Sequence, residues 1–258
     1  MSGPHTGDGA MGRNSPVVWI SGASSGIGAA LAESVPIPEA RVIGIARRPP
    51  TSGEHFEADL SDPRSWADVH ESFQRVVGTQ NVGRALFLHF AGDGAPHGRA
   101  STADPQHYAR SVQLNAASGL ILGQAFLHAC RQAEVPAVLV ICSSPGALAE
   151  HKGINHYGAS KAALLHWTQV VRAEEPDSVV LAVIPWATDT PMLREAMRQD
   201  PEAMPISGEL RAMADQGQLA TAHEVAEEIW AAVMDGAPRS PLHVGAPPPE
   251  IRLAGGSG

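Results

Sequence analysis

The sequence has few cysteines and few positive charges, and each shortage excludes a class of protein. Its two cysteines, Cys130 and Cys142, lie within apolar runs, which suits buried thiols in a reduced protein better than a disulfide framework. They also lack the spacing of a metal site, so we expect no metal. Lys and Arg number 18 against 27 Asp and Glu, a formal net charge of −9. Because binding to nucleic acid requires clustered cations, we expect no nucleic-acid partner.

Long apolar runs are also missing. No window approaches the roughly 18 uninterrupted apolar residues of a transmembrane helix, and the first residues lack the apolar region of a secretory signal. We therefore predict a cytoplasmic protein that does not enter a membrane. We expect a flexible leader at 1–15, one folded domain at 16–245 and a tail at 246–258.

Apolar runs of strand length alternate with longer segments of helical character. Such uniformly apolar runs are typical of strands buried on both faces of a parallel sheet. They occupy 17–20, 42–45, 85–88, 138–141 and 179–184, with 55–58 and 242–244 as shorter candidates, and the helical segments are 27–35, 63–77, 105–133, 157–174 and 221–234. This order predicts an α/β fold, a Rossmann-type doubly wound parallel sheet of about seven strands, with ligands at the carboxyl ends of the strands.

A glycine-rich turn follows the first predicted strand and leads directly into a helical segment. Its residues are Gly22, Ala23, Ser24, Ser25, Gly26, Ile27 and Gly28. Glycine lets the backbone turn tightly and approach a pyrophosphate, while free N–H groups at the helix start point at the anion. A plain strand-to-helix connection is the alternative, but the order strand, turn, helix favours a dinucleotide site.

The spacing Gly-x-x-x-Gly-x-Gly of this turn resembles that of the short-chain dehydrogenase/reductase family, and the resemblance covers about 16–244. It implies a nicotinamide nucleotide and a catalytic serine, here Ser144, thirteen residues before Tyr157, whose hydroxyl stabilises the substrate oxygen. Asn115 resembles the family's helix asparagine, which holds a water beside the active-site lysine. A local hydrogen bond or a bend in the helix would also explain Asn115.

Tyr157 and Lys161 stand four residues apart in a predicted helix and therefore share one face of it. The chain has only two tyrosines and two lysines, so coincidence is a poor explanation. A free tyrosine has a pKa of about 10 and is a sluggish base near neutral pH. Lys161, helped by an oxidised nicotinamide ring, is expected to lower the pKa of Tyr157 toward the working pH.

The end of the second predicted strand favours NADP(H) over NAD(H). Ala46 is followed by Arg47 and Arg48 and by no acid; a guanidinium pairs with a ribose 2′-phosphate, which a carboxylate would repel. The alternative is that one or both arginines are solvated surface charge. The family resemblance implies further cofactor contacts, besides Tyr157 and Lys161, at Asp59, Leu60, Ala91, Gly92, Pro185, Thr188 and Thr190. A helix N-cap next to Asp62 and Pro63 would explain the acids of this stretch equally well.

The chain departs from the family pattern at two places, and the segment 190–217 departs from the regular alternation of strands and helices. His89 and Phe90 replace both asparagines of the family's Asn-Asn-Ala-Gly, which changes the side chains available to that network. Trp186 replaces a glycine after Pro185. Its ring either lies near the pocket, where it would narrow the pocket or stack on an aromatic substrate, or packs in the core. Methionines and leucines among Pro and Gly breaks at 190–217 predict either a partly helical flap over a pocket or a surface insertion.

We predict hydride transfer between NADP(H) and the carbonyl or alcohol carbon of a small or medium apolar substrate, with ketone reduction favoured. Wide apolar arcs on the helices near 120–127 and 164–171 predict a homodimer or homotetramer. One alternative is an epimerase or dehydratase that uses the same tyrosine and lysine with a tightly held nucleotide. The other is a nucleotide-sensing module, which needs the glycine-rich turn but not the three catalytic side chains together.

Overall fold

Seven parallel strands form the central sheet in the order β3-β2-β1-β4-β5-β6-β9. The computed structural model describes residues 15–79, 81–237 and 239–245. The strands are β1 (Ser15–Ser21), β2 (Arg41–Ala46), β3 (Glu54–Glu57), β4 (Val82–His89), β5 (Ala137–Cys142), β6 (Val179–Pro185) and β9 (Leu242–Val244). The strand order reverses between β1 and β4, so the carboxyl ends of these two strands border the crevice where doubly wound sheets bind ligands.

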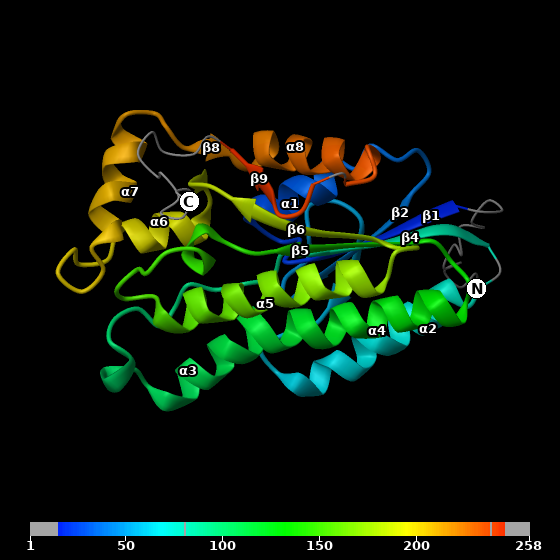
Figure 1. Ribbon diagram of the computed structural model, residues 1–258, viewed down its shortest axis with the longest axis horizontal. Coiled ribbons are helices and arrows are strands. Elements are labelled where there is room, and N and C mark those ends of the chain that lie inside the picture. Colours follow the sequence, from blue (N-terminus) through cyan, green and yellow to red (C-terminus); the bar gives the residue numbers. More distant parts are fainter. Residues whose placement is uncertain (1–14, 80, 238, 246–258) are drawn as a thin grey trace, which may run out of the picture.

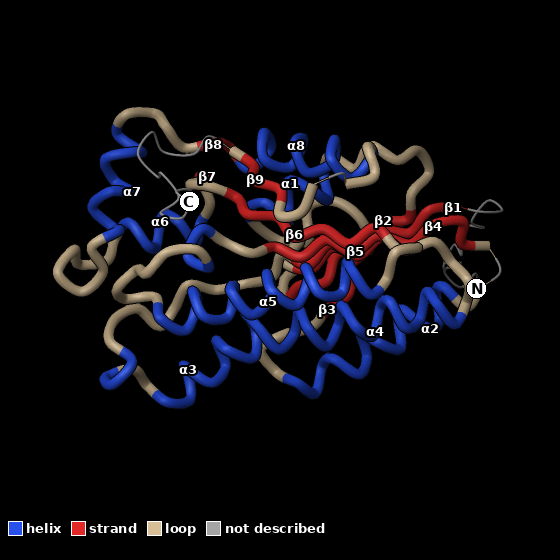
Figure 2. The backbone as a smooth tube through the Cα atoms, in the orientation of Figure 1, coloured by secondary structure: helices blue, strands red, loops and turns tan. Residues whose placement is uncertain are grey.

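Helices cover both faces of this sheet (Figures 1 and 2). One face carries α1 (Gly26–Glu33) and α8 (Ala222–Met234), and the other carries α2 (Trp66–Val77), α4 (Ser118–Gln132) and α5 (Asn155–Glu174). The remaining elements are α3 (Pro105–Val112), α6 (Pro191–Met197), α7 (Ile206–Asp215), the short pair β7 (Thr188–Asp189) and β8 (Ala220–Thr221), the 3₁₀ turns Pro63–Ser65, Ala100–Thr102 and Pro145–Ala147, and the π-helical turn η3 (Gln113–Ala117). The result is a three-layer α/β sandwich.

The central strands β1, β5 and β6 are almost entirely apolar because each contributes to two cores. In β1, Val17 and Trp19 point into the core under α2 and α4, while Val18 and Ile20 point into the core under α1 and α8. Side chains of a strand alternate between the faces of the sheet, so a strand covered on both faces must be apolar at every position. All four are fully buried, which confirms the interpretation of the uniformly apolar runs.

The predicted doubly wound sheet is confirmed, with differences of detail. The single helix expected at 105–133 is three consecutive pieces, α3, η3 and α4, and the segment 190–217 contains α6 and α7. Strand β1 begins at Ser15. The expected leader, apart from that residue, and the expected tail lie outside the described residues. Within the described part, no helix combines the length and the apolar character needed to cross a membrane.

Candidate active site

Tyr157 and Lys161 lie in the first turns of α5, at the carboxyl ends of β4 and β5. Lys161 is 2% exposed, and its Nζ lies 5.7 Å from the centroid of the Tyr157 ring. The ammonium donates a hydrogen bond to the carbonyl oxygen of Cys142 at 2.9 Å, which ties the helix to the end of β5. The structure therefore brings the phenol and the ammonium together, as the four-residue spacing predicts.

Two adjacent serines after β5 have different surroundings. Ser143 is 1% exposed, and its hydroxyl donates to the backbone carbonyl of Lys161 at 2.9 Å. The Ser144 hydroxyl caps the 3₁₀ turn that follows, accepting from the N–H of Gly146 at 3.2 Å, and it also hydrogen-bonds the Tyr157 side chain. Ser144 is thus the serine that faces the tyrosine, while Ser143 joins β5 to α5.

Burial dominates the electrostatics of the pair. Removal from water raises the pKa of Tyr157 above its usual value, the negative charge of Cys142 in its ionised form adds to the rise, and the hydrogen bond with Ser144 opposes it. Burial likewise lowers the pKa of Lys161. As a whole residue Tyr157 is partly exposed, so it is the enclosure of its hydroxyl that matters. The expected lowering of the tyrosine pKa is therefore not produced by the protein's own groups.

Asn115 lies in the π-helical turn η3 and is fully buried. Its amide oxygen accepts from the N–H of Asp93 at 2.9 Å, and its amide nitrogen donates to the carbonyl of Asp93 at 2.7 Å. The amide oxygen and Lys161 Nζ lie 3.0 and 3.6 Å from the point that a Cβ would occupy on Gly92. A side chain at residue 92 would therefore separate two of the predicted catalytic groups. Asn115 also makes the local hydrogen bond that the alternative interpretation expects, donating from its amide nitrogen to the hydroxyl of Ser111 at 3.0 Å.

The glycine-rich turn has the geometry that its sequence predicts. Gly22 and Gly26 have positive φ angles of 74° and 57°, which other residues adopt at a cost. A Cβ on Gly28 would lie 2.4 Å from the carbonyl oxygen of Gly22, so only glycine allows the helix to start this close to the strand. Ser25 is the N-cap residue of α1, and its hydroxyl makes no capping hydrogen bond to the first turn of the helix. The first N–H groups of α1 are therefore open to an anion such as the pyrophosphate that the sequence predicts here.

The residues expected around the nicotinamide come from the segment after β6. Pro185 ends that strand, and Thr190 packs against the turn, with its Cγ2 3.2 Å from the Cβ position of Gly26. The Thr190 hydroxyl accepts from the N–H of Leu193 at 3.2 Å and starts α6, whereas the Thr188 hydroxyl donates to the carbonyl of Trp186 at 2.8 Å. Both hydroxyls thus have partners within their own loop.

Trp186 packs inside the protein. Trp186 is 8% exposed, and its ring stacks on the ring of His243, with the two centroids 5.8 Å apart. Its backbone N–H donates to the carbonyl of Val244 at 2.9 Å. Of the two interpretations left open by the sequence, these contacts match core packing beside β9.

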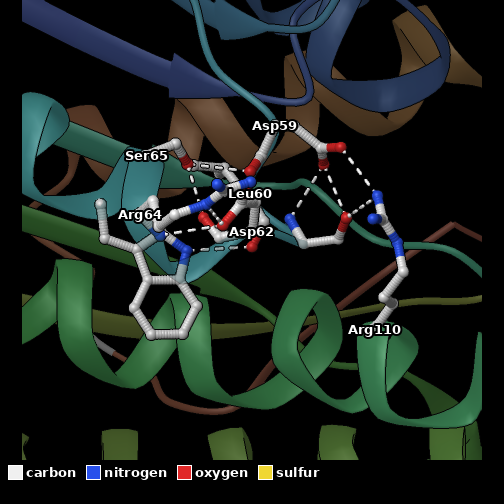
Figure 3. Close-up of polar contacts among 8 residues, drawn as sticks. Asp59, Leu60, Asp62, Arg64, Ser65 and Arg110 are labelled. Carbon is white, nitrogen blue, oxygen red and sulfur yellow. Dashed lines mark hydrogen bonds and ion pairs between the residues drawn. The ribbon is translucent and has the colours of Figure 1, made fainter. Parts of the chain in front are cut away.

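Arg47 and Arg48 follow β2 and are both exposed. Asp59 lies after β3, and its carboxylate accepts from the N–H and hydroxyl of Ser61 at 3.0 and 2.7 Å and from Arg110 of α3 at 2.9 Å (Figure 3). Burial acts to raise the pKa of Asp59, but the Ser61 hydrogen bonds and the charges of Arg47 and Arg110 outweigh it and lower the pKa. Arg110 is a contact that the sequence did not reveal.

The loop 59–62 that carries this aspartate is braced by the start of α2. The hydroxyl of Ser65 donates to the carbonyls of Asp59 and Asp62, and the indole of Trp66 donates to the carbonyl of Leu60 at 3.0 Å (Figure 3). The Leu60 side chain is 4% exposed and packs in the core. Of the expected pair Asp59 and Leu60, only the aspartate therefore presents its side chain toward solvent.

Comparison with known proteins agrees with this geometry. The family model for short chain dehydrogenases matches residues 16–201, so the chain belongs to this family of oxidoreductases. A benzil reductase ((S)-benzoin forming) from Bacillus cereus is 24% identical over 227 residues, covering 82% of this chain and 91% of the reductase.

Two solved structures resemble the fold. An aldohexose dehydrogenase from Thermoplasma acidophilum has a TM-score of 0.74 at 22% identity, covering 90% of this chain and 92% of the other. A short-chain dehydrogenase from Sphingobium yanoikuyae in complex with NADPH has a TM-score of 0.69 at 23% identity, covering 92% and 89%. These similarities confirm the single Rossmann-like domain.

Proposed function

We propose that this protein uses NADP(H) to reduce the carbonyl group of a small or medium apolar ketone or aldehyde, or to oxidise the corresponding secondary alcohol. One observation carries the proposal: Ser144 and Lys161 both lie next to Tyr157, and Lys161 Nζ also lies beside Gly92, after the carboxyl end of β4 and next to that of β1, where the glycine-rich turn begins. A nucleotide sensor needs the turn alone, so the three side chains favour an enzyme.

The chain's own residues fit the reductive direction. Ser144 would donate a hydrogen bond to the substrate oxygen, and Tyr157 would give it a proton as the oxygen becomes an alkoxide. Because burial raises the pKa of Tyr157, the phenol stays protonated near neutral pH, which is the form that a general acid needs. When bound, the reduced nicotinamide supplies the hydride. Lys161 places its ammonium beside the Tyr157 ring. Asn115 holds the backbone of Asp93 through a hydrogen bond to its N–H.

The preference for NADP(H) is supported by two exposed guanidiniums after β2, Arg47 and Arg48, and by the absence of an acid directly after that strand. The relative from Sphingobium yanoikuyae was solved with NADPH. The name of the Bacillus cereus relative, benzil reductase, makes aromatic diketones suitable first substrates.

The test is a panel of ketones, aldehydes and diketones, benzil among them, assayed by NADPH and NADH absorbance with the parent protein, Tyr157→Phe and Tyr108→Phe. Tyr108 is the chain's other tyrosine and serves as the matched control. We expect NADPH oxidation by the parent and the control, and a loss of about 100-fold or more in Tyr157→Phe. Parental turnover in Tyr157→Phe would contradict the mechanism. Substrate conversion without net change in nucleotide would instead indicate the epimerase or dehydratase alternative.

We also propose a homodimer or homotetramer that forms through α4 and α5, which lie next to each other on one face of the sheet (Figure 1). Ile121 of α4 is 49% exposed and Val170 of α5 is 42% exposed, although both are large and apolar. Light scattering should give a mass of two or four chains for the parent and a smaller mass for Ile121→Glu. Met234→Glu, at an equally exposed position of α8 on the other face, should keep the parental mass. A monomeric parent would refute the proposal.

A further inference from the structure

The imidazole of His89 is enclosed at the end of β4, one of the places where the chain departs from the family pattern. The residue is 0% exposed. Both ring nitrogens have hydroxyl partners: Nδ1 lies 2.9 Å from Oγ of Ser21, and Nε2 lies 3.3 Å from Oγ of Ser118. Because these two serines come from the end of β1 and the start of α4, the ring joins elements from opposite sides of the site.

The partners of the two serines determine where the protons lie. The Ser21 oxygen accepts from the N–H groups of Phe90 and Ala91, both at 3.1 Å, so its own proton is left to donate to Nδ1 of His89. The Ser118 hydroxyl donates to the carbonyl of Leu114 at 2.6 Å, so its oxygen is left to accept from the ring. Nδ1 therefore accepts and Nε2 donates.

The hydrogen bonds of Ser21 and those of Ser118 require the same form of the His89 ring, which is neutral and protonated on Nε2. A doubly protonated imidazole would bring a second donor to Ser21, which already accepts twice. Burial and the charge of Lys161 also lower the pKa of His89, to about 3. Every hydrogen bond in the chain from Ala91 to Leu114 is thus made in one consistent direction.

One end of this chain of hydrogen bonds lies next to the glycine-rich turn, and the other end lies in the π-helical turn η3 that contains Asn115. Ser21 directly precedes Gly22, whose Cβ position lies 2.9 Å from the backbone nitrogen of Ala91, so the glycine-rich turn and Ala91 are in contact. Leu114 directly precedes Asn115 in η3, where the backbone N–H of Ser118 bonds to Gln113 in the π-helical pattern. The Ser118 hydroxyl donates to the carbonyl of Leu114, the residue that follows Gln113.

We propose that His89 is a positioning residue that holds the glycine-rich turn and the Asn115 turn at a fixed spacing, one through each ring nitrogen. The inference rests on the proposed function, because it assumes that a nicotinamide nucleotide binds at the turn. Loss of the Nδ1 arm should therefore weaken nucleotide binding, and loss of the Nε2 arm should slow proton transfer.

Two substitutions each keep one arm. In His89→Asn the amide oxygen stands near the place of Nδ1 and accepts from Ser21, but the side chain is too short to reach Ser118. In His89→Gln the amide nitrogen reaches the place of Nε2 and donates to Ser118, while Ser21 loses its acceptor. We expect His89→Gln to raise the Kd for NADPH about tenfold and His89→Asn to lower kcat about tenfold at near-parental Kd.

Ser118→Ala is an independent test of the Nε2 arm, because it removes the partner of Nε2 without changing the His89 ring. It should reproduce the loss in kcat of His89→Asn, and the two changes together should cost no more than either alone. Melting curves identify any variant that fails to fold, in which case Ser118→Ala still tests that arm. Equal changes in Kd and kcat in both His89 variants, or additive losses in the double variant, would overturn the proposal.

A spectroscopic readout separates this inference from the proposed function. In ¹⁵N-histidine-labelled protein, the His89 signals, assigned by their disappearance in His89→Asn, should show a neutral ring with its proton on Nε2 from about pH 7 down to about pH 5. A doubly protonated ring or a proton on Nδ1 would refute the hydrogen-bond chain. Failure of the parent to bind any nicotinamide nucleotide would refute the proposed function while leaving this spectrum as the test of the ring.

Discussion

Acidification should destabilise this protein through the buried imidazole of His89. The pKa of the ring falls from 6.5 in the unfolded chain to about 3 in the folded protein, first because of burial and then because of the Lys161 charge. Between these two values the unfolded state binds one more proton than the folded state, so the free energy of unfolding decreases as the pH falls. The contribution of His89 is fully present above about pH 6.5 and is lost progressively below it.

The size of the effect follows from the two pKa values. From about pH 7.5 to pH 5, the proton on the unfolded chain costs about 2 kcal/mol, of which about 1.2 kcal/mol falls between pH 6 and pH 5. In this window the slope is set by the unfolded pKa of 6.5, provided that the folded pKa lies well below 5. His97 and His156 add to the parental slope in the same direction, because burial lowers their pKa values as well.

The assay compares urea unfolding of the parent and His89→Asn at several pH values between about 5 and 7.5. The variant will differ in absolute stability, but its loss between pH 6 and pH 5 should be smaller than the parental loss by about 1.2 kcal/mol. His128→Asn, which removes a histidine elsewhere in the chain, is the control for loss of any one imidazole. Equal pH slopes in the parent and His89→Asn would refute the neutral, buried ring on which the reasoning depends.

Three further results are expected. Gly28→Ala should destabilise the protein by about 1–3 kcal/mol in urea unfolding and weaken NADPH binding, because its Cβ would lie 2.4 Å from the carbonyl oxygen of Gly22. Arg47→Asp should raise the KM for NADPH about tenfold and leave that for NADH nearly unchanged, with Arg48→Asp as the parallel variant. Alcohol oxidation should accelerate as the pH rises above neutrality, since burial raises the pKa of Tyr157, whereas ketone reduction should not; stopped-flow absorbance measures both.

The parts of the site that the sequence predicts are those formed by neighbouring residues. The glycine-rich turn and the pair Tyr157 and Lys161 have fixed spacing along the chain, so their geometry follows from a turn and a helix. The strands are equally readable, because burial on both faces requires an apolar residue at every position. These elements appear in the structure with boundaries shifted by a few residues.

The contacts that sequence reasoning missed join residues far apart in the chain. His89 meets Ser21 over 68 positions, and Arg110 meets Asp59 over 51. No local pattern marks such pairs, because they form where the sheet and helices place them. The π-helical turn at Asn115 escaped prediction for a related reason: the apolar period continues through it, and the partner of the Asn115 side chain, the backbone of Asp93, lies 22 positions away in the chain.

The same distinction explains the pKa of Tyr157. The sequence shows a cation four residues from a phenol, and from that pair alone a lowered pKa follows. The structure adds the enclosure of both groups and the hydrogen bond from Lys161 to the carbonyl of Cys142, and burial becomes the larger influence on the phenol. The surroundings of the pair, more than the pair itself, therefore determine the pKa of the phenol. In the proposed reduction, the protonated phenol is the form that gives its proton to the substrate oxygen.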